Sequence, residues 1–281
     1  MTPPFAKHSV PMGRKPLSGA LLAALRKATR LHAIRLIVAT GALCLSSASR
    51  AEPPDGFVYL SDIDPSIIQD IRYYGAHNFV GRRSDGYDAP ECVLTREAAL
   101  ALSRVQTLLR KENVSLIVWD CYRPARAVAD FMRWSKNPAE RGMKAEFFPS
   151  TAKSSLFARG YISARSAHSR GSTVDLGLAP KGSSLAAFDP AAPLVACTAP
   201  KKERFQDGAL DMGTGFDCFD SRAKIANTGL TGEAQKNRMR LRRAMIAGGF
   251  KPYDNEWWHF ELENEPFRRK SFDFPVEPKG R

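Results

Sequence analysis

The pattern of apolar positions between residues 95 and 112 predicts an amphipathic helix. Apolar residues recur there at spacings of four, three and four: Ala98, Leu102, Val105 and Leu109. Side chains at these spacings lie on one face of a helix, and Leu108 would widen that face. Thr95 is a suitable N-cap, although the acidic or amide residue of a capping box is missing three positions later.

The remaining pattern predicts short elements that do not alternate regularly between strand and helix. Ser115–Trp119 is a short, mostly apolar run typical of a buried strand, and Pro124 follows its end. Because helices and strands are segregated, we expect an α+β domain whose mainly antiparallel sheet is flanked by helices. The other expected elements are strand-like pieces within 57–75, helices at 125–135 and 231–248, two short strands within 161–178 around a turn at Ser169-Arg170-Gly171, loops over 181–230 and a strand at 257–262.

The first 51 residues have the pattern of an export signal. A basic stretch precedes an apolar run at 36–45, and Ser49 and Ala51 fit the small-x-small cleavage rule. That run is shorter than the roughly 20 residues that span a bilayer. We therefore expect a signal peptide at 1–51, a mature domain at 52–281, a periplasmic or secreted protein, and no stable membrane insertion after cleavage. An uncleaved anchor and a disordered basic tail are the alternatives.

The positive charge of the chain is concentrated in this N-terminal segment. The formal net charge is +13, but residues 1–51 hold eight of the 42 basic residues and none of the 29 acidic ones. The rest of the chain therefore carries 34 basic against 29 acidic residues. No basic stripe with interleaved aromatic residues remains, so we do not expect nucleic acid as a partner.

The cysteines agree with export. Four follow the predicted signal, and an even number in an oxidising compartment suggests disulfides. Of the three possible pairings we favour Cys92–Cys121 and Cys197–Cys218, the second of which would close a polar stretch. The alternative is four unpaired thiols.

A histidine and an aspartate with a glycine turn between them form the first candidate for chemistry. His168 and Asp175 are seven residues apart, and Gly171 lies between them. On the two arms of a hairpin, their side chains could converge on one point. Imidazole and carboxylate are both good zinc ligands.

The second candidate is Glu256-Trp257-Trp258-His259. Few histidines lie outside the predicted signal, so His259 is the leading third ligand. Three protein ligands and one open position are typical of a catalytic zinc. Glu256, three residues earlier, would lie in a bend before the strand, from which it could act as a general base on a water molecule. Each signal is weak alone, because single histidines and aspartates are more often structural.

Taken together, these residues resemble the zinc D-alanyl-D-alanine dipeptidase family, which includes the vancomycin-resistance dipeptidase and periplasmic relatives. The chain contains the family's S-x-H-x-x-G-x-x-x-D and E-x-x-H motifs, at 166–175 and 256–259. Further stretches that fit in the same order are Asn78–Gly81, Asp85–Tyr87, Asp120–Val128 and Ser271–Val276. The likeness runs from about residue 57 to 277. Two departures are Thr173, where alanine is usual, and a longer stretch at 181–220.

The resemblance implies roles for eight residues and a D,D-peptidase or hedgehog-like fold. His168, Asp175 and His259 would hold one Zn²⁺. Glu256 would be the general base, and Arg123 would stabilise the oxyanion of the tetrahedral intermediate. Asp217 resembles the family's anchor for the substrate ammonium group, while Ser166 and Tyr87 resemble residues that line the site.

The implied reaction is hydrolysis of D-alanyl-D-alanine to two D-alanines by metal-activated water, with a small D,D-dipeptide as substrate. The first alternative is a related D,D-carboxypeptidase that trims longer peptidoglycan stem peptides in an open cleft. The second is a non-catalytic wall-binding or partner-binding module on the same scaffold. The presence of every residue needed for turnover favours an enzyme over such a module.

Overall fold

The computed structural model describes residues 52–227, 229–230 and 232–279. The predicted export signal at 1–51 lies outside the described residues. Among the residues described, no helix has both the length and the apolar character needed to cross a membrane. In chain order the elements are β1 (Phe57–Tyr59), α1 (Leu60–Ile63), β2 (Ile68–Gln69), η1 (Arg72–Tyr74), β3 (Val93–Thr95), α2 (Arg96–Arg110), β4 (Val114–Asp120), α3 (Ala125–Lys136), α4 (Lys144–Phe147), η2 (Lys153–Ser155), η3 (Ala167–Arg170), β5 (Thr173–Pro180), η4 (Ser221–Ala223), α5 (Gly232–Ala247), β6 (Phe250–Tyr253) and β7 (Glu256–Leu262), where η marks a 3-10 helix.

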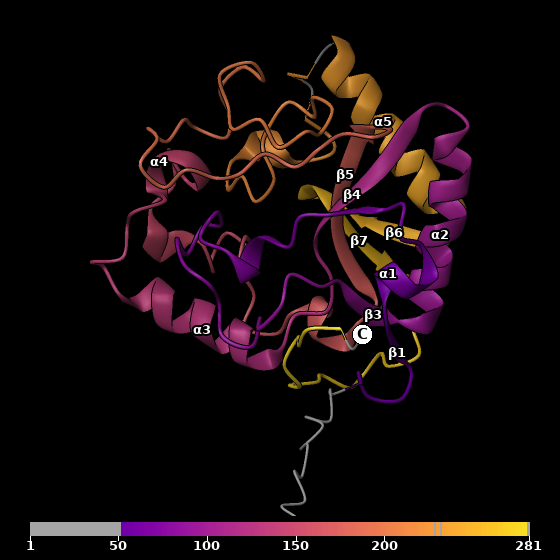
Figure 1. Ribbon diagram of the computed structural model, residues 1–281. Coiled ribbons are helices and arrows are strands. Elements are labelled where there is room, and N and C mark those ends of the chain that lie inside the picture. Colours follow the sequence, from indigo (N-terminus) through magenta and orange to yellow (C-terminus); the bar gives the residue numbers. More distant parts are fainter. Residues whose placement is uncertain (1–51, 228, 231, 280–281) are drawn as a thin grey trace, which may run out of the picture. The chain divides into compact units, whose positions relative to one another are not determined.

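A five-stranded mixed sheet with the order β2-β4-β5-β7-β6 forms the framework (Figure 1). The pair β2 and β4 is parallel, and the pairs β4–β5, β5–β7 and β6–β7 are antiparallel. Helices α2 and α5 contact each other and pack on one face of this sheet, while α3 and α4 lie on its other side. The expected α+β class is confirmed, with a sheet that mixes the two pairing directions.

Helix α2 carries the predicted apolar stripe. Its N-cap is Thr95, whose Oγ1 accepts a hydrogen bond from the Ala98 backbone N–H. Leu102 is 0 % exposed, whereas Leu108 is 51 % exposed. The expectation that Leu108 widens the buried face is wrong, because successive residues are turned by about 100° around a helix and Leu108 therefore points well away from Leu109.

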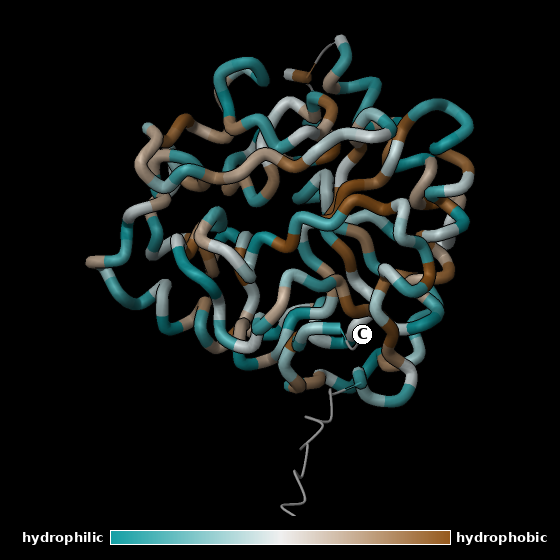
Figure 2. Tube along the Cα trace, viewed as in Figure 1, coloured by the Kyte–Doolittle hydropathy of each residue, from teal (hydrophilic) through white to brown (hydrophobic). Residues whose placement is uncertain are grey.

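The central strands β4 and β5 are the most completely buried part of the sheet, and they include strongly hydrophobic stretches of the chain (Figure 2). Gly177 of β5 lies directly against Trp119 of β4. A Cβ atom at Gly177 would come within 2.5 Å of the Trp119 ring, so this close approach requires glycine. The ring of Phe216 also stacks on the ring of Trp119, with the ring centroids 5.1 Å apart. Trp119 therefore joins the sheet to the loops that follow β5.

Residues 161–178 do not form the two strands expected there. The helix η3 comes first and β5 follows it. The Ser166 hydroxyl accepts a hydrogen bond from the His168 backbone N–H at 3.2 Å and so begins the helical turn, which Gly171 ends at a φ of +81°. His168 is therefore presented by a capped turn beside the strand that carries Asp175, rather than by the opposite arm of a hairpin.

The segment 181–230 is irregular in its described residues apart from η4, as expected. Both favoured disulfides are confirmed. The Cys92–Cys121 bond joins the residue before β3 to the residue after β4. The Cys197–Cys218 bond lies within the irregular segment, where regular hydrogen-bonded structure is missing.

Because Leu102 is buried and Leu108 is exposed, replacing each by alanine should lower the free energy of unfolding by different amounts. We expect Leu102→Ala to lower the free energy of unfolding by about 2–5 kcal/mol, because it leaves a cavity in the core. The matched variant Leu108→Ala should change it by about 0.5 kcal/mol or less. Urea denaturation followed by circular dichroism measures both. Equal losses would contradict the placement of α2 against the sheet.

Candidate metal centre and active site

Strand register places three polar side chains in one row across the sheet. Asp120 of β4 pairs with Asp175 of β5, and Asp175 pairs with His259 of β7. Residues directly opposite each other on neighbouring strands project from the same face. The row therefore brings residues that are far apart in the sequence to one point on one side of the sheet.

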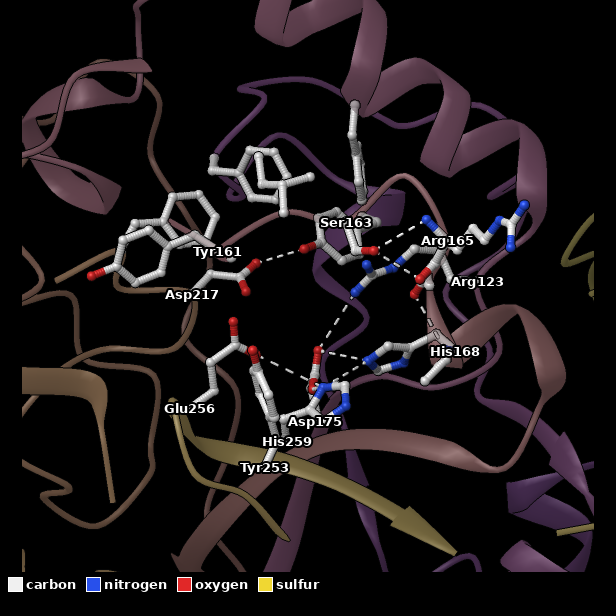
Figure 3. A pocket seen from close by; sticks show the side chains of 18 of the residues that line it. Arg123, Tyr161, Ser163, Arg165, His168, Asp175, Asp217, Tyr253, Glu256 and His259 are labelled. Carbon is white, nitrogen blue, oxygen red and sulfur yellow. Dashed lines mark hydrogen bonds and ion pairs between the residues drawn. The ribbon is translucent and has the colours of Figure 1, made fainter. Parts of the chain in front are cut away.

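His168 reaches this row from η3 and completes a cluster with Asp175 and His259 (Figure 3). Its Nε2 lies 3.3 Å from Asp175 Oδ2 and 3.3 Å from His259 Nδ1. His259 Nδ1 lies 3.0 Å from Asp175 Oδ1. One ligand atom from each of the three residues falls within 4.8 Å of the others, which is the spacing expected of atoms that share one metal ion. The cluster thus joins the three residues that the sequence predicts as metal ligands.

Outer contacts orient both imidazole rings. His168 Nδ1 donates a hydrogen bond to the backbone oxygen of Cys121 at 2.8 Å, which leaves Nε2 free to face the cluster. His259 turns Nδ1 inward and Nε2 toward Glu261, whose Oε1 is 3.7 Å away. Partners of this kind on the far ring nitrogen are typical of metal-binding histidines.

The electrostatics of the cluster favour positive charge. Burial alone would raise the pKa of Asp175, but the two histidines hold it well below its ordinary value. Burial would likewise lower the pKa of His259, but Asp175 and Glu261 outweigh this and raise it to about 10. The site therefore binds a proton tightly at the position where a divalent cation would compete for the same lone pairs. The donor set and its charge fit a metal ion.

Glu256 lies beside the cluster because β7 is irregular. The sequence predicts a bend before the strand, but Glu256 is the first residue of β7. It lies three positions before His259, an odd spacing that would normally put the two side chains on opposite faces. The pairing with β6 shifts register between Tyr253 and Pro252, and this irregularity brings Glu256 Oε2 to 3.8 Å from His259 Nδ1.

The surroundings of Glu256 raise its pKa to about 7, through burial first and then the charge of Asp175. A carboxyl group with this pKa can accept and return a proton near neutral pH.

Arg123 is held in place by Asp120. Its Nε donates a hydrogen bond to Asp120 Oδ2 at 2.9 Å, and its Nη2 forms ion pairs with the same oxygen at 2.7 Å and with Asp175 Oδ2 at 3.6 Å. The guanidinium also lies 5.0 Å from the centre of the Tyr73 ring. The predicted oxyanion-stabilising arginine is therefore both a strand-end ion pair and a fixed cation at the edge of the cluster.

Asp217 lies in the same cavity, on the side away from His168 (Figure 3). It is 5 % exposed, and Tyr73 donates a hydrogen bond to its Oδ2 at 2.6 Å. Burial, followed by the negative charge of Asp175, raises the pKa of Asp217 well above its ordinary value. Its charged form therefore requires a cationic partner.

The two remaining predicted site residues differ in position. Ser166 lines the cavity and caps η3. Tyr87 does not belong to the cavity lining: it is buried, and its hydroxyl donates to Asp120 Oδ1 at 2.6 Å. The expectation that Tyr87 lines the site is therefore corrected. Its ring lies behind Asp120, and it acts on the site through that carboxylate.

Two residues near the centre had no predicted role. Asp120 accepts hydrogen bonds from both Arg123 and Tyr87, and Tyr73 contacts both Arg123 and Asp217. The position of Asp120 at the end of a predicted strand was a usable signal for it. Tyr73 and Tyr74 are adjacent in the sequence, which does not indicate which of the two side chains faces the site.

The cavity that contains these groups has a volume of about 250 Å³. Apolar side chains form part of its wall, including Phe79, Phe131, Ile162 and Phe219. Its charged groups include a histidine and carboxylate cluster suited to a metal, an adjacent carboxyl group with a pKa near neutrality, a fixed guanidinium and a second carboxyl group. A metal-holding cluster with a proton acceptor and an anion-stabilising cation defines the class of metal-dependent hydrolases.

Comparison with known proteins identifies the family within this class. The peptidase M15 family, described as D-Ala-D-Ala dipeptidase, matches residues 54–186 and 203–277. The chain therefore belongs to this family of metallopeptidases.

Among its relatives are D-alanyl-D-alanine dipeptidases from three bacteria. The protein from Streptomyces coelicolor is 36 % identical over 221 residues, or 78 % of this chain and 98 % of the relative. The proteins from Enterococcus faecium and Enterococcus faecalis are 34 % and 32 % identical over 223 residues, which cover 79 % of this chain and 98 % of each relative.

The cluster predicts one tight metal site per chain. We expect purified protein to bind one Zn²⁺ in a calorimetric titration. His168→Ala or Asp175→Ala should weaken binding by more than the roughly 10–100-fold that outer partners contribute. The matched control is His77→Gln, since His77 is a buried histidine paired with Glu146 away from the cluster. Tight binding that survives loss of His168 or Asp175 would contradict the assignment.

Proposed function

We propose that this protein is a zinc-dependent D-alanyl-D-alanine dipeptidase that releases two D-alanines. The observation that carries the proposal is the presence of Asp217 in the same small cavity as Glu256 and the His168–Asp175–His259 cluster. A carboxyl group there would bind the ammonium group of a short peptide while the peptide bond lies beside the cluster. The names of the three bacterial relatives support the same substrate.

Zinc is the metal that the donors favour. Two imidazoles and one carboxylate leave a fourth position open, an arrangement typical of catalytic zinc sites. When bound there, zinc would supply Lewis-acid chemistry and lower the pKa of a water molecule toward about 7.

The chain's own residues would perform proton transfer, stabilise the developing negative charge and bind the substrate ammonium group. Glu256 would accept a proton from the attacking water and return it to the amine of the leaving alanine. Arg123 would stabilise the negative charge that develops on the carbonyl oxygen, because Asp120 already holds its guanidinium in a fixed orientation. Asp217 would become charged as it pairs with the substrate ammonium group.

The carboxyl group of Asp217 in the cavity favours a dipeptide over the D,D-carboxypeptidase alternative. A stem peptide presents an amide where a dipeptide has an ammonium group. Binding it would leave Asp217 protonated, so a stem peptide would not gain the ion pair that a dipeptide forms there.

We further propose that the protein is exported and has the D,D-peptidase or hedgehog-like fold. The basic and apolar pattern of residues 1–51 and the two disulfides support export, since disulfides persist mainly in oxidising compartments. The mixed sheet with α2 and α5 on one face supports the fold type.

The proposed reaction predicts a narrow substrate range. Zinc-loaded protein should hydrolyse D-Ala-D-Ala and leave both the L,L isomer and a stem pentapeptide intact, as measured by release of free alanine. Glu256→Gln should lower kcat by about 10²–10⁴-fold, because it keeps the shape of the side chain but cannot accept the proton. The control Glu263→Gln changes an exposed residue just after β7 and should be without effect. A Glu256→Gln enzyme with an unchanged kcat would contradict the proposal that Glu256 is the general base.

A charge-removing variant separates the dipeptidase from the carboxypeptidase. Asp217→Asn should raise KM for D-Ala-D-Ala by about tenfold or more, because a paired charge contributes about 1.5–3 kcal/mol. Asp189→Asn, an exposed change in the same irregular segment, is the control. Cleavage of a stem peptide that is indifferent to Asp217→Asn would instead support the carboxypeptidase.

A further inference from the structure

Asp217 is held in an unfavourable backbone conformation on an irregular loop. Its φ is +54°, in the left-handed region that non-glycine residues seldom adopt. Such a conformation persists only where the surrounding structure over-determines it. Residues 212–219 belong to neither a helix nor a strand, so something other than regular secondary structure must hold this backbone.

Cys197 holds the chain on both sides of Asp217. Before it, the Gly215 N–H donates a hydrogen bond to the Cys197 backbone oxygen at 2.8 Å. After it, Cys218 is bonded to Cys197 through the disulfide. Within the described residues, this disulfide and this main-chain hydrogen bond are the ones that join Gly215–Cys218 to another segment of the chain.

Cys197 is itself anchored to helix α4. Its N–H donates to the Glu146 oxygen at 2.9 Å, and the Phe219 N–H donates to the Phe147 oxygen at 2.8 Å. The disulfide, the three main-chain hydrogen bonds and α4 thus form a closed frame that includes the backbone of Asp217. Cys197 and Cys218 are both buried, so the frame is part of the packed interior.

This frame includes a segment that the family match leaves out. The match stops at residue 186 and resumes at residue 203, and Cys197 lies between them. The stretch that supplies one half of the disulfide is therefore outside the part of the chain that is aligned with the family.

We propose that the Cys197–Cys218 disulfide is a positioning element for substrate recognition, which fixes the Asp217 carboxyl group where it meets the substrate ammonium group. This inference rests on the proposed function. The carboxyl group keeps its own hydrogen bond from Tyr73, but that bond orients the side chain only while the backbone beneath it stays in place. Glu256 lies in β7 and Arg123 in the turn after β4, so neither residue is part of the frame.

The test is a double-mutant cycle between the disulfide and Asp217. In the Cys197→Ala/Cys218→Ala variant, KM for D-Ala-D-Ala should rise by no more than the factor that Asp217→Asn costs, about tenfold, while kcat and zinc content change little. Added to Asp217→Asn, the same pair should raise KM no further, because the group that it positions is already lost. An unchanged KM, or an effect that simply adds to Asp217→Asn, would overturn the proposal.

The other disulfide provides the comparison. Cys92→Ala/Cys121→Ala also removes a buried crosslink, but it should leave the effect of Asp217→Asn on KM at its full size. If the Cys197→Ala/Cys218→Ala protein does not fold, Cys197→Ala/Cys218→Val restores buried volume without the crosslink.

Hydrogen exchange separates failure of this inference from failure of the proposed function. The Gly215 and Phe219 amides should lose protection in the disulfide variant, while amides of β5 and β7 keep theirs. If the wild-type protein does not cleave D-Ala-D-Ala, the function fails but this measurement still tests the frame. Retained protection at both amides would overturn the inference whatever the activity.

Discussion

The pairing of β5 with both of its neighbours is the constraint on which the site depends. Its register with β4 sets Asp175 opposite Asp120, and its register with β7 sets Asp175 opposite His259. A slip of one residue in either pairing would turn the affected side chains to the other face of the sheet. The register shifts beside Trp119 and beside Tyr253 are therefore features of the site, since they adjust which side chains meet at its centre.

Charge compensation is the second requirement, because the site gathers several buried ionisable groups in a small volume. Asp120 balances Arg123, and the two histidines keep Asp175 ionised. Glu256 lacks such a dedicated partner, and its pKa rises to about 7. Neighbouring carboxyl groups thus differ in pKa through their surroundings: Asp175 is held as an anion, whereas Glu256 can accept or release a proton near neutral pH.

The sequence was sufficient for features that depend on local spacing. Periodicity located α2, and the spacing of His168, Asp175, His259 and Glu256, read through the family motif, identified the residues that converge. It was not sufficient where tertiary contacts decide the outcome. Leu108 had the right residue type but the wrong angle, and the cap at Ser166 turned an expected strand into η3. Tyr87 was expected to line the site, but it binds Asp120, which in turn holds Arg123; the contact between Tyr87 and Asp120 joins distant parts of the chain and cannot be read from local spacing.

The sheet and the irregular segment contribute to the site in different ways. Groups suited to bond breaking sit on paired strands or on turns fastened to them, whereas Asp217 belongs to a loop outside the sheet. Mutations in that loop can accumulate without moving the paired strands provided that they keep the contacts of Phe216 with Trp119 and of Thr214 with Trp257. Such a scaffold is evolvable: selection can retune which peptide is admitted while the reaction performed on it stays the same.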